Sequence, residues 1–270
     1  DKQFGVIGDG TTDDTTALQN AINYVVHNSA KNVAAQCSLG LLGNEIRVTD
    51  TIHWLYGDGT GSLHVRGFAR PFRPEAAFNG VTIKSEVTDR MANSICGARH
   101  AVFENINTVG LADSGFSSLD RGALNWEDET TWNGVLTTAG FTNPGERYAP
   151  RAGWCVDGYS GTKPGGASGS GTEPYPTPTL ASFISAGTDG YGRTSSSRVD
   201  FINCGSSGFE LGYGVGSSLD GLQGDYVSFF KCHAERCKII HSVGQSQSRG
   251  VALDHLLMSV FYLGVTNNTH

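Results

Sequence analysis

The chain has 270 residues, of which 38% are hydrophobic and 17% are charged, and its formal net charge is −7. This length can bury a substantial core, as one large domain or two small ones. The acidic balance and the absence of a Lys/Arg run exclude a phosphate-backbone footprint and an anionic membrane surface, so nucleic acid is not an expected partner. No stretch reaches the apolar length that spans a bilayer, and membrane insertion is not expected.

Glycine is the outlier in the composition. The 37 glycines are about twice the usual share of roughly 7%. Turn-rich, weakly charged chains of this kind favour an all-β protein with many short strands. The six cysteines are scattered with no zinc-binding spacing, so they are interpreted as buried free thiols, and no metal or cofactor is predicted.

The segment from Phe4 to Ile22 carries the clearest pattern: a strand, a turn and one amphipathic helix. Gly8-Asp9-Gly10 predicts a tight turn, because glycine reaches positive φ without steric cost. Asp13 and Asp14 can cap the first N–H groups of a helix. Apolar residues then recur at helical spacing: Ala17, Leu18, Ala21, Ile22, Val25 and Val26.

Read as F-G-x-x-G-D-G-x-x-D-D-T-x-A-x-Q-x-A-I, this segment resembles the opening motif of pectate-lyase-superfamily proteins, which include phage tailspikes and capsule depolymerases. The resemblance implies a right-handed parallel β-helix, with residues 1–30 forming an N-terminal cap whose α-helix covers the open end. It also implies a homotrimer. The motif carries no catalytic residue, and Asp9, Asp13 and Asp14 are interpreted as turn and cap residues rather than metal ligands. Residues 41–52 follow the family's next strand–turn–strand outline without its usual proline.

The C-terminal third contains repeats at a period suited to the rungs of a β-helix. Residues 198–204 align with 226–232 and with 250–256. A second set aligns Phe209 with Cys237 and Phe261, and Leu211 with Ile239 and Leu263. Alternation places one set of side chains inward, stacked in columns: Val199, Phe201, Val227, Phe229, Val251 and Leu253. Weaker rungs are predicted at residues 80–84, 101–106 and 180–184.

A single domain over residues 1–270 is therefore expected, with long loop insertions at residues 114–150 and 158–178. Loops on a rigid scaffold are where function is usually sited. The chain ends shortly after an apolar rung, so either further C-terminal sequence or neighbouring subunits are expected to cover that end.

Catalysis by a glycoside hydrolase would need two carboxylates roughly 5 to 9.5 Å apart. The candidates are Asp200 and Glu210 on outward strand positions, and Glu127 and Asp128 in the first insertion. The outward column of Asp200 continues as Ser228 and Ala252, and that of Glu210 as Lys238 and Tyr262, so neither column supplies a pair. Ordinary surface roles are the alternative for Asp200 and Glu210.

Two further kinds of site are considered. A lyase would need a cation and a base, which His233 with Arg236, or Lys238, could supply near a turn. Flat aromatic side chains in or beside the insertions could instead bind sugar rings. The substrate-binding candidates are Trp126, Trp132 and Tyr175, with Trp154 and Tyr159 nearby; packing between loop and scaffold is the alternative for the tryptophans.

Three functions follow from this pattern. The first is a tailspike-like virion protein that binds, and in an active form depolymerises, a bacterial surface polysaccharide, alongside other virion tail proteins. The second is a secreted polysaccharide lyase or hydrolase. The third is a structural virion appendage without activity. The N-terminus has no signal-peptide character, which favours a location on the virion over secretion.

Overall fold

The computed structural model describes residues 1–31, 37–42, 44–55, 61–68, 80–87, 91–95, 98–110, 152–156, 196–209, 211–216, 224–243, 250–254 and 257–267. These residues are mostly β-strand. A 3-10 helix (η1, Lys2–Phe4) and one α-helix (α1, Thr15–Lys31) accompany the strands. The strands are β1 (Asp9–Asp13), β2 (Cys37–Leu41), β3 (Glu45–Val48), β4 (Ile52–Leu55), β5 (Gly61–Gly67), β6 (Val81–Ser85), β7 (Asn93–Ile95), β8 (Ala98–Glu104), β9 (Ile106–Val109), β10 (Ala152–Val156), β11 (Val199–Ile202), β12 (Gly205–Ser207), β13 (Leu211–Val215), β14 (Val227–Phe230), β15 (His233–Val243), β16 (Ala252–Asp254) and β17 (Leu257–Asn267).

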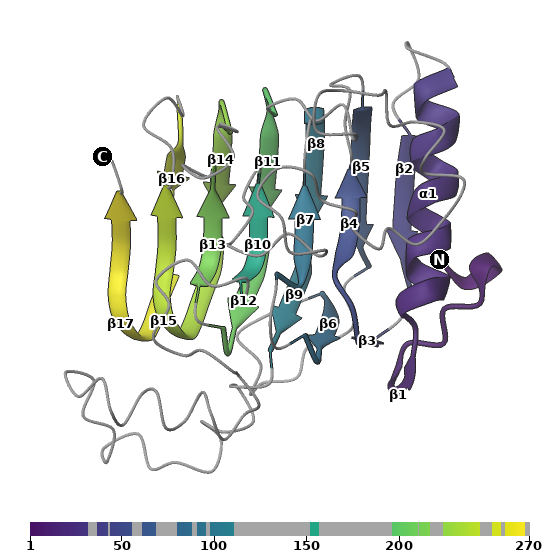
Figure 1. The fold of residues 1–270 in the computed structure, drawn as a ribbon, viewed down its shortest axis with the longest axis horizontal. Coiled ribbons are helices and arrows are strands. Elements are labelled where there is room, and N and C mark those ends of the chain that lie inside the picture. Colours follow the sequence, from purple (N-terminus) through teal and green to yellow (C-terminus); the bar gives the residue numbers. More distant parts are fainter. Residues whose placement is uncertain are drawn as a thin grey trace, which may run out of the picture.

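The strands form three parallel stacks (Figure 1). One stack is a six-stranded sheet in the order β16-β14-β11-β8-β5-β2. The other two stacks, β3-β6-β9-β12 and β4-β7-β10-β13, join into one sheet through β15, which pairs with β12 near its start and with β13 near its end. Along the chain, successive strands join the three stacks in turn. Each pass around the three stacks forms one layer, which lies against the layer before it.

The register confirms the predicted columns. Val199 pairs with Val227, and Phe201 pairs with Phe229, which pairs with Leu253 in the next layer. In a second stack, Leu211 pairs with Ile239 and Ile239 with Leu263. The predicted inward residues of β11 and β14 are almost completely buried, whereas Leu253 is 39% exposed at the C-terminal end of the column. The predicted rungs at 80–84 and 101–106 correspond to β6 and β8–β9; residues 180–184 lie outside the described residues.

Helix α1 lies at the N-terminal end of the stacks and contacts β2, β4 and β5 (Figure 1). Its predicted apolar stripe is confirmed, since Leu18, Ala21 and Ile22 are buried in the same core as the strands. Asp13 Oδ1 accepts a hydrogen bond from the Thr15 N–H at the helix start, at 3.0 Å. The capping role predicted for the Asp14 side chain is wrong, because its carboxylate accepts instead from Ile7 and Gly8, at 2.7 and 2.8 Å. Strand β1 begins within the predicted turn, at Asp9, and Gly8 and Gly10 have the positive φ expected there, 66° and 78°. The segment before it forms η1.

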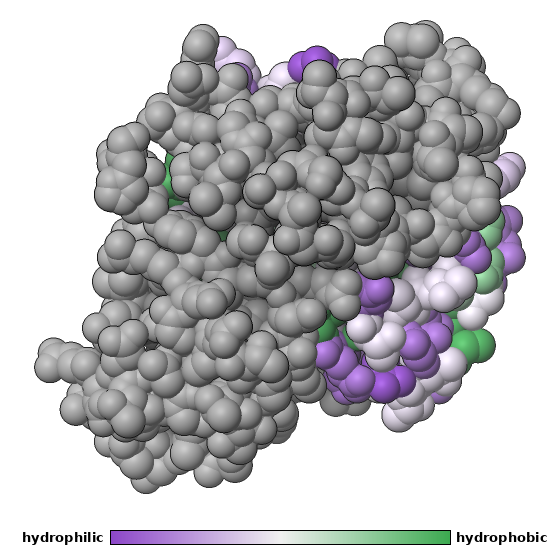
Figure 2. All heavy atoms as spheres, viewed as in Figure 1, coloured by the Kyte–Doolittle hydropathy of each residue, from purple (hydrophilic) through white to green (hydrophobic). Residues whose placement is uncertain are grey.

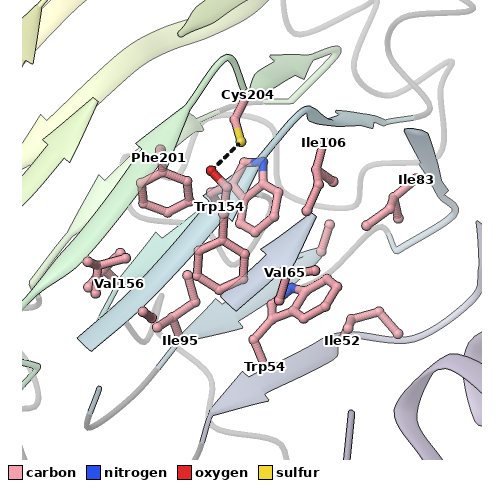
Figure 3. Close-up of a cluster of buried hydrophobic side chains, with 14 of the residues drawn as sticks. Ile52, Trp54, Val65, Ile83, Ile95, Ile106, Trp154, Val156, Phe201 and Cys204 are labelled. Atoms are coloured by element: carbon pink, nitrogen blue, oxygen red, sulfur yellow. Dashed lines mark hydrogen bonds between the residues drawn. The ribbon is translucent and has the colours of Figure 1, made fainter. Parts of the chain in front are cut away.

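The interior is filled by aromatic rings from two stacks (Figure 3). Phe103, Phe201 and Phe229 form one column, with ring centroids 5.4 and 4.9 Å apart. Trp154 packs against Phe103 and Phe201 at 5.4 and 5.3 Å. Each such pair contributes about 0.5–1.5 kcal/mol beyond the burial of area. The column of like residues therefore holds successive layers together.

Four cysteines in the described part, Cys155, Cys204, Cys232 and Cys237, are buried free thiols, as predicted. Cys204 donates to the carbonyl oxygen of Phe103 at 3.3 Å, the contact drawn as a dashed line in Figure 3. Burial raises the pKa of the Cys155 and Cys232 thiols to about 12. Because the thiolate is the nucleophilic form, these side chains are inert packing groups.

Left-handed residues occupy the corner between the six-stranded sheet and its neighbour. Asn105, Asn203 and Lys231 follow β8, β11 and β14 with φ of 56°, 51° and 53°. Asparagine tolerates this region better than most residues. The Asn203 side chain donates to the Asn105 side-chain oxygen at 2.7 Å, so the corner of one layer is bonded to the next.

Candidate functional site: the open face of the six-stranded sheet

The outer surfaces of the three stacks differ in exposure. In the β4 stack, outward positions in several layers are at most 8% exposed: His53, Ser94, Cys155 and Ser242. In the β3 stack Asn107, Ser207 and His233 are similarly buried, whereas Glu45 and Lys84 in its first layers are 42% and 43% exposed. The outward positions of the six-stranded sheet are instead half-buried or exposed in every layer from β5 to β16. This outer surface, termed the open face, is therefore the one that stays accessible in every layer from β5 to β16.

The parallel register arranges the side chains of the open face in rows. The middle row is His64, Val102, Asp200, Ser228 and Ala252, from β5 to β16. The row toward the strand ends is Arg66, Glu104, Ile202, Phe230 and Asp254. The row toward the strand starts begins with Ser62 and His100, which pair directly, and continues with Arg198 and Tyr226, which precede β11 and β14. Neighbouring strands lie about 4.8 Å apart, so adjacent members of a row can contact one ligand.

Asp200, the predicted carboxylate on β11, lies at the centre of a polar network. Its Oδ1 accepts a hydrogen bond from Ser228 Oγ at 2.6 Å. Its Oδ2 lies 3.5 Å from Arg198 Nε and 3.9 Å from His100 Nε2. The Asp200 side chain is 23% exposed and that of Arg198 is 61% exposed. The carboxylate therefore lies beneath a guanidinium group that reaches into solvent.

Glu104, on the neighbouring strand β8, has a similar set of partners. Its Oε2 lies 3.5 Å from Arg66 Nε and 3.4 Å from His64 Nε2. The Glu104 side chain is 24% exposed. The open face thus contains the same combination twice: a half-buried carboxylate with one arginine and one histidine.

Apolar and aromatic groups lie among these charges. Val102 and Ile202 occupy the two positions diagonally between Glu104 and Asp200. Phe230 is 38% exposed and lies under Lys231 Nζ, 5.2 Å from the ring centroid. Tyr226 is 60% exposed and has a φ of 54°, which is unusual for a bulky residue. Strained residues concentrate at functional sites, so the exposed Tyr226 ring is a candidate ligand contact.

The structure describes only one of the predicted catalytic and substrate-binding residues, Asp200. Asp200 is confirmed on an outward strand position whose column continues as Ser228 and Ala252. The other candidates, Glu210, Glu127, Asp128, Trp126, Trp132 and Tyr175, lie outside the described residues, as does Tyr159. The two predicted insertions lie within residues 111–151 and 157–195, between β9 and β10 and between β10 and β11.

Two of the alternatives are wrong. Trp154 does not contact sugar, because it is 1% exposed and packs in the core. His233 and Arg236 lie inside β15 rather than at a surface turn. His233 is 5% exposed, and burial, with Arg236 nearby, lowers the pKa of its imidazole to about 4. A base in that position does not reach a polymer.

Glu104 is the site residue that the sequence interpretation missed. Residues 101–106 were recognisable as a rung, but the insertions separate them from residues 198–204 by almost a hundred positions. Aligning Ala101 with Val199 places Glu104 beside Ile202, diagonal to Asp200, and this alignment was the signal that could have found it.

Comparisons with protein-family models, with curated protein sequences and with solved structures give no match to this chain. Among the described residues, no helix has the length and apolar character to cross a membrane. The same part of the chain contains no group of three or more His, Cys, Asp and Glu side chains suited to a metal ion. Where the described surface is visible in Figure 2, hydrophilic and hydrophobic residues are intermixed. The functional proposal therefore depends on the open face itself.

Proposed function

We propose that the chain is a right-handed parallel β-helix of the tailspike class and that its open face binds a bacterial surface polysaccharide. The N-terminal motif and the layered parallel stacks with a helix at one end support the β-helix and its likeness to the pectate-lyase superfamily. A homotrimer on a phage tail, in contact with other tail proteins, is the assembly that this likeness implies. The mass of the protein in solution tests it: a trimer is expected, and a monomer would favour the secreted enzyme.

The observation that carries the binding proposal is the composition of the open face. Sugar rings present hydroxyl groups at their edges and C–H surface on their faces, so their sites combine polar groups with apolar or aromatic surface. The open face supplies both over several layers, with Asp200, Glu104 and the two arginines beside Val102, Tyr226 and Phe230. A long, shallow, repeating surface suits a polymer better than a small molecule.

Polysaccharide hydrolysis is a second candidate, favoured by the relation between Asp200 and Glu104. They lie on adjacent strands, two positions apart along the strand direction. This offset separates their Cα atoms by about 8 Å. Inverting glycosidases need two carboxyl groups roughly 6.5–9.5 Å apart, a spacing that side chains on such positions can reach. One would act as general acid and the other would activate water on the opposite side of the sugar.

A panel of bacterial surface polysaccharides, assayed for binding and for release of reducing ends, tests both candidates. Asp200→Asn, Arg198→Ala and Tyr226→Ala are each expected to weaken binding at least fivefold. Arg47→Ala is the matched control, because Arg47 forms an ion pair with Glu86 at 2.7 Å on a different stack. Equal loss in the control, or no binding to any polysaccharide, would reject the proposal. Release of reducing ends without an unsaturated product, lost in both Asp200→Asn and Glu104→Gln, would establish hydrolysis rather than elimination by a lyase.

A further inference from the structure

We infer that the open face selects a neutral, hydroxyl-rich glycan over a polyanionic one. The inference rests on the proposed function and specifies the class of ligand. It comes from the way in which the charges of the open face are paired.

Both arginines in the rows of the open face are already matched with a carboxylate. Arg66 lies 3.5 Å from Glu104, and Arg198 lies 3.5 Å from Asp200. Each carboxylate also has a histidine within 3.9 Å. The carboxylate compensates the positive charge of its guanidinium. The remaining N–H groups of the guanidinium can still donate hydrogen bonds to a ligand.

The formal charge of the open face is close to zero. Its rows contain three carboxylates, Glu104, Asp200 and Asp254, and two arginines, which gives −1 with neutral histidines. Arg99, at the irregular start of β8, and Lys231, in the turn after β14, lie at its margin and change the sum to +1. The whole chain carries −7. A polyanion would thus find at most one unit of net positive charge on this face, and the net charge of the whole molecule would repel it.

A neutral sugar can use every group of the open face as it stands. Hydroxyl groups donate to the carboxylates of Glu104 and Asp200 and accept from the free N–H groups of the arginines. The C–H surface of a ring packs against Val102 and Ile202, between the two carboxylates. No existing ion pair has to break for these contacts to form.

An acidic sugar would instead have to displace a carboxylate from its arginine. The displaced Asp200 or Glu104 would remain beneath the ligand, because both are strand residues on the same surface, and would repel the ligand's negative charge. Exchange of one carboxylate for another brings no net electrostatic gain. The pairing therefore disfavours polyuronates and sialic-acid polymers.

The test compares neutral polymers (dextran, mannan and a galactan) with acidic polymers (polygalacturonate, alginate and polysialic acid) on the full-length protein. The expected result is binding to at least one neutral polymer, with an affinity that changes less than about twofold between 50 and 500 mM NaCl, because no counterions are released. Tighter binding to acidic polymers, weakening steeply with salt, would overturn the inference and leave the proposed function intact. Binding to no polymer of either class would reject the proposed function, and the inference with it.

A variant that neutralises both carboxylates gives a second readout. The double variant Glu104→Gln/Asp200→Asn keeps the shape of the open face but releases both arginines. It is expected to bind neutral polymers at least fivefold more weakly and to acquire salt-sensitive binding to acidic ones. Glu45→Gln is the control, since Glu45 pairs with Lys84 at 2.7 Å on another stack. A correctly folded double variant that still prefers the same neutral polymer with unchanged affinity would contradict the inference.

Discussion

The side chain of Gln19 pairs with the backbone of His53 as a neighbouring strand would. Gln19 Nε2 donates to the His53 carbonyl oxygen and Gln19 Oε1 accepts from the His53 N–H, both at 2.9 Å. His53 belongs to β4, the end strand of its stack. Helix α1 thus both covers the apolar end of the core and satisfies backbone groups that the stack leaves unpaired at that edge.

Replacing Gln19 by alanine is expected to lower the free energy of unfolding by about 3 kcal/mol, because two buried backbone groups lose their partners. Chemical denaturation of the two proteins measures the difference. Asn20→Ala, at an exposed position of the same helix, is the control and is expected to change stability by less than about 0.5 kcal/mol. Equal effects of the two substitutions would show that the Gln19 contact is not what holds the helix in place.

Substitutions of the left-handed corner residues in two adjacent layers are expected to have opposite effects on stability. Asn203→Ala removes the 2.7 Å bond to Asn105 and places alanine at a positive φ, and is expected to cost about 1–2 kcal/mol. Lys231→Asn places at φ 53° a residue that tolerates this region better, and a gain of up to about 1 kcal/mol is expected. The unfolding midpoints in denaturant check both changes. If Lys231→Asn is less stable than the parent protein, the lost contact between Lys231 and Phe230 outweighs the gain from a residue that tolerates positive φ better.

Gly212 in β13 is predicted to allow the close approach of this strand to β15. A Cβ at this position would lie 2.6 Å from the Ile240 carbonyl oxygen and 3.5 Å from Cys237 Sγ. The carbonyl belongs to the β15 backbone and cannot rotate away, so Gly212→Ala is expected to cost about 1–3 kcal/mol. Gly5→Ala is a useful comparison, because nothing lies within 4 Å of a Cβ there and only its φ of 89° opposes the substitution. Thermal unfolding of both variants separates overpacking from backbone strain.

Acid should destabilise the C-terminal layers through His241. Both ring nitrogens are buried without a hydrogen-bond partner, and the ring packs edge-on against Phe229 at 4.9 Å. Burial lowers the pKa of His241 from 6.5 to about 4. Between these two values the unfolded chain binds the proton and the folded one does not, so stability falls as the pH drops from about 6.5 to 4.

The His241 contribution is on the order of 3 kcal/mol over that window. His241→Leu should therefore show a shallower decline of the denaturation midpoint between pH 6.5 and 4 than the parent protein. His233, whose pKa is also lowered to about 4, leaves some dependence in the variant. The same slope in both proteins would show that His241 does not contribute.

Much of the fold could be predicted because it depends on local and periodic patterns. The helix stripe, the columns of Val199 and Phe201, and the buried thiols all follow from alternation and repeat spacing. The pairing between residues 101–104 and 199–202 could not be predicted so readily, because the chain between them is long and the strands are short. The motif also could not show which N–H groups the Asp14 carboxylate binds, because both the segment before β1 and the start of the helix offer N–H donors.

Only part of the candidate site could be predicted, because prediction depended on how clearly each layer repeats in the sequence. Asp200 was found because its own strand belongs to the clear repeats. Glu104, its partner across the open face, belongs to a layer that repeats only weakly. The burial of Trp154 depends on the side of the strand that it faces, and near the sheet bend simple alternation fails: Gly153 and Trp154 both point inward. His233 is buried although it occupies an outward position.

Oxidative footprinting of the aromatic residues, with and without the polysaccharide that binds most tightly in the panel, shows whether the ligand covers the open face. Tyr226 and Tyr24 are similarly exposed, at 60% and 58%, but Tyr226 is on the open face and Tyr24 is on α1. The ligand is expected to slow oxidation of Tyr226 and Phe230 severalfold and to leave that of Tyr24 unchanged. Bound polysaccharide that leaves Tyr226 and Phe230 as reactive as before would contradict the assignment of the open face as the binding site.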